Sequence, residues 1–158
     1  MLKRITALFM VLIMSFCFTS CNKQKTDNAV NENLQKHYQS DEFYYDYKTN
    51  HYKFRLPKFW KGKYNVSVLT HREDFYEVNS FNKDETGLLF SILEYEDESY
   101  KTELDGKNYT YLCYDKRFEL HYIFLLPDEE IYPEEFAQDY NALKEGVHIA
   151  KATFKAEL

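Results

Sequence analysis

The sequence predicts an α+β domain, in which a twisted antiparallel sheet of about six or seven strands carries a long C-terminal helix on one face. The first observation is a series of short apolar runs between residues 43 and 126, where apolar positions mostly alternate with polar ones. This period of two is typical of strands, and short turns between neighbouring strands favour antiparallel pairing. The second observation is a change of period after Pro133, where apolar residues recur every three or four positions and predict a helix.

The first two strands are predicted in the segment EFYYDYKTNHYKFRLP, with a turn near residues 48–50. The second strand alternates regularly between an apolar face, made of Tyr52, Phe54 and Leu56, and a polar face, made of His51, Lys53 and Arg55. Pro57 ends the ladder because proline has no N–H to donate. Residues 58–62 are then expected to form a turn or a single helical turn.

Further strands are expected at residues 64–68, 72–80 and 86–95. The run TGLLFSILEY, at residues 86–95, is apolar on both faces and predicts a central strand that is covered from both sides. Asp105 and Gly106 form a dipeptide that is typical of hairpin turns. They precede two more predicted strands, YTYLCYDK and FELHYIFLLP.

The C-terminal helix is predicted to begin near Pro133, a residue that is favoured in the first helical turn. Its apolar stripe consists of Phe136, Tyr140, Leu143, Val147, Ala150 and Phe154. Gly146 lies within this stripe and costs the helix about 1 kcal/mol relative to alanine. Gly146 is therefore expected to mark a kink or an early end of the helix.

The N-terminal residues have the order of a bacterial lipoprotein signal. Lys3 and Arg4 precede an apolar run at residues 5–16, which is shorter than the about 20 residues that a membrane-spanning helix needs. The sequence Phe18-Thr19-Ser20-Cys21 resembles a lipobox, the motif whose cysteine receives diacylglycerol. An ordinary signal peptide or an uncleaved anchor is the alternative interpretation.

The expected organisation is a lipoprotein signal peptide at residues 1–20, a polar tether at 21–40 and a single α+β domain at 41–158. A short helix is the alternative for the tether. Lipidation of Cys21 would attach the domain to the outer face of the cytoplasmic membrane, because a diacyl anchor supplies two chains. Once Cys21 is acylated, Cys113 is the remaining thiol, which excludes an intramolecular disulfide.

The charge of the chain disfavours several classes of partner. The formal net charge is −6 at pH 7, and removal of a basic signal peptide makes the mature chain more acidic. An acidic surface repels the phosphates of nucleic acids and the anionic headgroups of lipids. We therefore expect no nucleic-acid partner, and we expect the lipid at Cys21 to supply the attachment to the membrane.

The candidate binding surface consists of Trp60, Lys61, Lys63 and Tyr64, in the segment WKGKY after Pro57. Trp60 is the single tryptophan, and it is expected either to plug the core, with its N–H bonded to a carbonyl, or to form an exposed platform for a ligand. The lysines beside it are either a solvated rim or a contact for an anion. The 15 tyrosines are expected to be mostly cross-strand partners, with a contiguous binding face as the alternative.

No catalytic, metal-binding or cofactor motif is recognisable in the sequence. The acidic runs at residues 94–98 and 128–130 are expected to be solvated loops, and a hard-cation site is the alternative. Cys113 is expected on the same strand face as Tyr109 and Tyr111, as a small buried hydrophobe. A nucleophilic pair of Cys113 with His121 on adjacent strands is conceivable.

The order of these features resembles a family of small uncharacterised secreted or lipid-anchored proteins of low-GC Gram-positive bacteria. The matching pieces are Leu56-Pro57, WKGKY at residues 60–64, GLLFSI at 87–92 and the closing helix at 135–154. The chain departs from the family pattern at Lys53, where glycine is usual, and in KFW at residues 58–60, where ESW is usual. The resemblance implies a PsbP-like α/β fold over about residues 43–156. It implies no catalytic residue.

These observations predict a lipid-anchored extracytoplasmic binding or interaction module that is not an enzyme and needs no cofactor. Its partner would be an envelope protein or a component of the cell wall. The first alternative is an envelope lipoprotein that binds a small ligand or a cation. The second is an envelope hydrolase without a recognisable motif.

Overall fold

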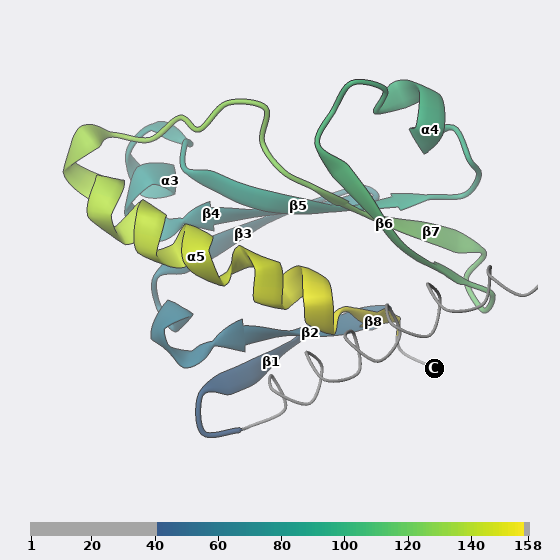
Figure 1. Ribbon diagram of the computed structural model, residues 1–158, viewed down its shortest axis with the longest axis horizontal. Helices are drawn as coiled ribbons and strands as arrows, with labels where there is room; N and C mark the ends of the chain where they lie inside the picture. The colour runs from purple at the N-terminus through teal and green to yellow at the C-terminus, as the bar shows by residue number, and fades with distance from the viewer. Residues whose placement is uncertain (1–40, 157–158) are drawn as a thin grey trace, which may run out of the picture. The chain divides into compact units, whose positions relative to one another are not determined.

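The computed structural model describes residues 41–156, which belong to one compact unit (Figure 1). The expected signal peptide, its Cys21 and the expected tether lie outside the described residues. The α+β class is confirmed, with antiparallel strands and a C-terminal helix. The prediction of one sheet of six or seven strands is wrong, because the strands within residues 41–156 form two sheets, of three and five strands.

The smaller sheet has the order β1-β2-β8, formed by β1 (Tyr44–Lys48), β2 (Tyr52–Pro57) and β8 (Lys155–Ala156). The predicted hairpin of the first two strands is confirmed, with Tyr47 opposite Phe54. The predicted alternation in β2 is also confirmed, because Tyr52, Phe54 and Leu56 are almost completely buried.

The larger sheet has the order β3-β4-β5-β7-β6. Its strands are β3 (Tyr64–Leu69), β4 (Arg72–Glu77), β5 (Leu88–Tyr95), β6 (Tyr109–Asp115) and β7 (Leu120–Leu125). The predicted central position of the apolar run is confirmed, since β5 lies in the middle of this sheet. Its two faces contribute to different clusters, with Ile92 in the main core and Leu93 under helix α4 (Tyr100–Glu103).

The two sheets separate after Pro57. The chain leaves β2 through one 3-10 turn, η1 (Lys58–Trp60), so that β3 pairs with β4 and not with β2. The apolar face of β2 then packs across the core on the larger sheet. Phe54 lies 5.5 Å from Phe75, Phe75 is stacked 4.4 Å from Phe90, and Phe90 is stacked 4.7 Å from Phe124, measured between ring centroids.

The C-terminal helix follows the 3-10 turn η2 (Glu134–Phe136) and runs without interruption as α5 (Ala137–Thr153). It packs against β2 and β5, as Figure 1 shows, with Tyr140, Leu143, Val147 and Ala150 in the core. The expected kink or early end at Gly146 is wrong, because the helix continues through this residue. None of the helices in residues 41–156 is long and apolar enough to cross a membrane.

Two further predictions are wrong, one on the end of a strand and one on the kind of turn. The strand expected at residues 72–80 ends at Glu77 and is followed by helix α3 (Val78–Asp84), because the Glu77 carboxylate accepts hydrogen bonds from the N–H groups of Asn79 and Ser80. Asp105 and Gly106 do form a turn, but it joins α4 to β6 and closes no hairpin.

Candidate functional site

Trp60 does not belong to an exposed binding surface. Its side chain is 0% exposed and packs in the main core, which confirms the interpretation as a core plug. The expected hydrogen bond to a carbonyl is absent among the described residues, because the buried Trp60 Nε1 has no partner there. The indole edge instead faces Gly146 of α5.

The other members of the predicted surface lie at the rim and are already in contact with neighbouring groups. Lys61 Nζ lies 5.0 Å from the centre of the Tyr45 ring, and Lys63 Nζ lies 3.2 Å from a carboxylate oxygen of Asp139 in α5. Tyr64 is half-buried and stacks near Phe75. This segment therefore ties β3 to the core and to α5.

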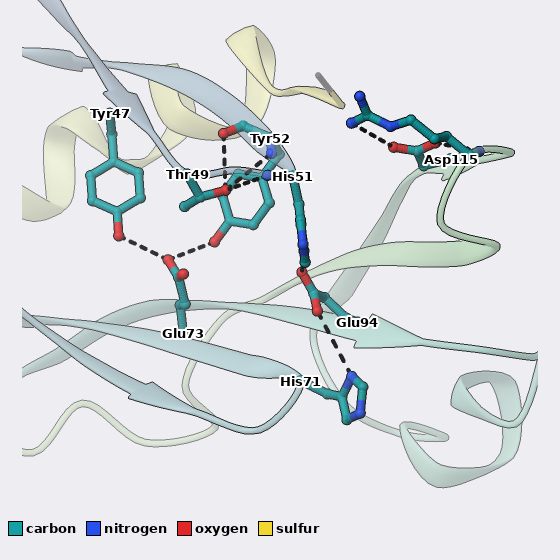
Figure 2. Close-up of polar contacts among 9 residues, drawn as sticks. Tyr47, Thr49, His51, Tyr52, His71, Glu73, Glu94 and Asp115 are labelled. Atoms are coloured by element: carbon teal, nitrogen blue, oxygen red, sulfur yellow. Dashed lines mark hydrogen bonds and ion pairs between the residues drawn. The ribbon is translucent and has the colours of Figure 1, made fainter. Parts of the chain in front are cut away.

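A polar cleft opens at one end of the space between the two sheets. Figure 2 shows three side chains of the β1–β2 hairpin (Tyr47, His51 and Tyr52) facing Glu73 of β4, Glu94 of β5 and His71 of the turn between β3 and β4. Thr49 Oγ1 bonds the backbone of its own hairpin. The cleft has a volume of about 170 Å³, and its apolar lining is formed by Val68, Leu69 and Ile92. Its charged groups come from segments that are distant in the sequence.

Glu73 is held by two tyrosine hydroxyls. Tyr47 Oη and Tyr52 Oη both donate to Glu73 Oε2, at 2.9 and 2.7 Å. Burial raises the pKa of both tyrosines, and the charge of Glu73 raises it further, so both hydroxyls remain protonated donors. The carboxylate is therefore fixed in orientation by two donors from the other sheet.

Glu94 lies between two imidazoles. His51 Nδ1 is 3.3 Å from Glu94 Oε1, and His71 Nδ1 is 3.8 Å from Glu94 Oε2. His71 adopts a left-handed conformation, with φ of 58°, in the turn between β3 and β4, and its carbonyl accepts a hydrogen bond from Glu94 N at 2.9 Å. The turn thereby places the imidazole beside the carboxylate.

The cleft was not predicted from the sequence. Glu73 shares a strand face with the buried Phe75, and Glu94 shares one with the buried Ile92. The feature of the sequence that could have indicated the cleft is a carboxylate at a strand position that faces the core. The partners of these carboxylates could not be found in this way, because only the packing of one sheet on the other brings the β1–β2 hairpin to them.

The acidic runs do not form a recognisable cation site. Asp128 pairs with Lys107, and Glu130 pairs with Lys144. Within residues 41–156, no group of three or more histidine, cysteine or carboxylate side chains is arranged to hold a metal ion.

The outer face of the larger sheet carries a cluster of tyrosines. A bulge between Tyr111 and Cys113 shifts the register, so that Tyr111 lies opposite Ile123 and Tyr114 lies opposite His121. Tyr109, Tyr111 and Tyr114 consequently share the face that is covered by α4, and Tyr111 and Tyr114 are 43% and 42% exposed. Tyr111 stacks on Tyr100 of α4, at 5.7 Å between ring centroids.

The same bulge separates Cys113 from its predicted neighbours. Cys113 lies opposite Tyr122 and packs against the main core, whereas His121 lies on the tyrosine face. The expectation that Cys113 shares a face with Tyr109 and Tyr111 is wrong for this reason. The conceivable Cys113–His121 pair is not formed, because the two side chains project from opposite faces of the sheet.

Comparison with protein-family models, with curated proteins and with solved structures finds no match to this chain. The cleft and the tyrosine face are therefore the features of the molecule from which we infer a function.

Proposed function

We propose that this protein is a lipid-anchored extracytoplasmic binding module, attached through Cys21 to the outer face of the cytoplasmic membrane, and that the polar cleft binds a small cationic ligand. The proposal combines the lipobox with the acidic character of the cleft. The observation that carries it is the placement of Glu73 and Glu94 at core-facing positions, where both carboxylates line the same opening.

The charge of the cleft favours a cation as the ligand. The lining includes one permanently cationic side chain, Arg72, and its Nε donates to Asp74 at 2.6 Å. A ligand ammonium group can therefore bond a carboxylate that is partly removed from water, where a charge-assisted hydrogen bond is strong.

The dimensions of the cleft favour a small ligand. An apolar cavity of about 150 Å³ holds a benzene molecule, and the cleft has a volume of about 170 Å³. A compound of a few heavy atoms with one primary or quaternary ammonium group fits this space. Val68, Leu69 and Ile92 would contact its carbon atoms.

The tyrosine face supports a second candidate, the binding of an envelope protein or a component of the cell wall. Its exposed rings, Tyr111 and Tyr114, lie together because of the bulge in β6. Tyrosine supplies a large amphipathic contact area at a low cost in entropy. This function would use β6, an edge strand of the larger sheet.

We also propose that the chain is a member of the PsbP-like family that it resembles in sequence. The support is the order of the motifs and the packing of the last helix on antiparallel strands.

Thermal denaturation of the whole chain tests the cation proposal. Ethanolamine, choline and putrescine are compared with ethylene glycol as a neutral probe, and Ca²⁺, Mn²⁺ and Zn²⁺ are included. An amine at 100 times its Kd should stabilise the protein by about 2.7 kcal/mol and raise its Tm by several degrees.

Glu94→Gln and Glu73→Gln should abolish this rise, while Glu134→Gln, at an exposed position outside the cleft, should preserve it. Equal shifts for the amines and the neutral probe, or shifts that survive both cleft variants, would contradict the proposal.

A further inference from the structure

A second cavity lies between helix α5 and the larger sheet. It has a volume of about 250 Å³ and shares no lining residue with the cleft that contains Glu73 and Glu94. Its floor is formed by Leu89 of β5, Phe124 of β7 and Val147 of α5, which are nearly completely buried. Tyr140 closes one side, because its hydroxyl donates to the Leu88 carbonyl at 2.9 Å.

The wall contributed by α5 is basic. Lys144, His148 and Lys151 are spaced by four and three residues, so they lie on one face of the helix, and all three line the cavity. Lys144 forms an ion pair with Glu130, which also lines the cavity.

Lys151 differs from Lys144 in its surroundings. Its side chain is partly buried at the edge of the apolar floor, and within residues 41–156 no carboxylate forms an ion pair with it. An ammonium group that lies beside an apolar floor without a carboxylate partner can form a charge-assisted hydrogen bond with an added anion. An anion at this position would supply the missing partner.

We propose that this cavity binds a small monocarboxylate with an apolar, ring-sized body, and that Lys151 bonds the carboxylate. The size of the proposed ligand follows from a comparison with an apolar cavity of about 150 Å³, which holds benzene. The present volume of about 250 Å³ leaves space for a ring and a carboxylate arm. An apolar floor with a few convergent polar groups is the usual composition of a small-molecule site.

The ligand class is opposite in charge to the one proposed for the cleft. The two sites also share no lining residue. Binding at the two sites can therefore be tested separately, and a failure of one proposal is distinguishable from a failure of the other.

Titration of the whole chain with benzoate, phenylacetate and the neutral analogue benzamide tests the proposal, with isothermal calorimetry and NMR chemical shifts as readouts. The carboxylates should bind saturably and perturb the signals of Leu89 and Val147. Benzamide should bind about tenfold more weakly or worse, which is the effect expected from losing one charge-assisted hydrogen bond.

Lys151→Met keeps the apolar stem and removes the charge. It should weaken carboxylate binding about tenfold or more and leave benzamide binding unchanged. Lys116→Met, at an exposed lysine outside the cavity, should change neither. Glu94→Gln, in the other site, should also leave benzoate binding intact.

Val147→Phe provides a second variant, because the larger side chain fills the cavity and should abolish binding of both probes, with circular dichroism as the check on folding. Equal affinity for benzoate and benzamide, or benzoate binding that Lys151→Met does not weaken, would overturn the proposal.

Discussion

Gly146 lies so close to Trp60 that a Cβ atom on Gly146 would be 2.7 Å from Trp60 Nε1. The same Cβ would lie 2.9 Å from Pro57 Cγ. The glycine in the middle of α5 is therefore explained by the tertiary contact, because it allows the helix backbone to approach the indole and the end of β2. Glycine lowers the stability of the helix, but a larger residue at this position would clash with Trp60 and Pro57.

Gly146→Ala should destabilise the protein although alanine is the better helix former. Alanine would gain about 1 kcal/mol in helix propensity, but overpacking of a core typically costs about 1–3 kcal/mol. We expect a lower free energy of unfolding in urea denaturation. Trp60→Phe should reduce the cost of Gly146→Ala, because part of the clash is removed.

The exposed Ala142 on the same helix provides the control. Ala142→Gly should cost about 1 kcal/mol from propensity alone. A stabilising effect of Gly146→Ala would show that the helix can move away from Trp60 without loss.

The protein should lose stability as the pH rises above about 10. Burial, followed by the charge of Glu73, raises the pKa of Tyr52 above the ordinary tyrosine value of 10.0. Because the folded pKa is the higher one, the stabilising contribution is complete below pH 10 and decreases as the unfolded chain begins to ionise. Each such group lowers the free energy of unfolding by about 1.4 kcal/mol per pH unit in this range.

Urea denaturation between pH 8 and pH 11.5 measures this slope. Tyr52→Phe should make this slope less steep, because one ionising group fewer contributes to it. An unaltered slope in Tyr52→Phe would contradict the expectation.

Cys113 should react slowly with thiol reagents in the folded protein. Burial raises the pKa of its thiol, so the reactive thiolate is scarce near neutral pH. In a whole chain carrying Cys17→Ser and Cys21→Ser, labelling by a maleimide or by Ellman's reagent should be much faster in urea than in buffer. Equal rates in the two solutions would show that the thiol is accessible in the folded state.

Metabolic labelling tests the lipid anchor at Cys21. Cells supplied with a clickable fatty acid should label the wild-type chain and Cys17→Ser but not Cys21→Ser. Labelling of Cys21→Ser at the wild-type level would remove this proposal and, with it, the attachment to the membrane.

The local pattern of residues determined several parts of the fold. The alternation of Tyr52, Phe54 and Leu56 predicted the strand and its buried face, the apolar run at residues 86–95 predicted a central strand, and the stripe from Phe136 to Ala150 predicted the helix. These features follow from the sequence because each depends on neighbouring residues and on burial of one face.

Tertiary packing decided the features that depend on contacts between distant residues. The division into two sheets, the uninterrupted helix at Gly146 and the meeting of Tyr47 and Tyr52 with Glu73 all depend on segments that lie far apart in the chain. The bulge before Cys113 similarly moved its side chain to the core face. A period of two or 3.6 residues describes one element at a time. Most elements could therefore be predicted from local patterns, whereas the side chains that meet depend on how the elements pack.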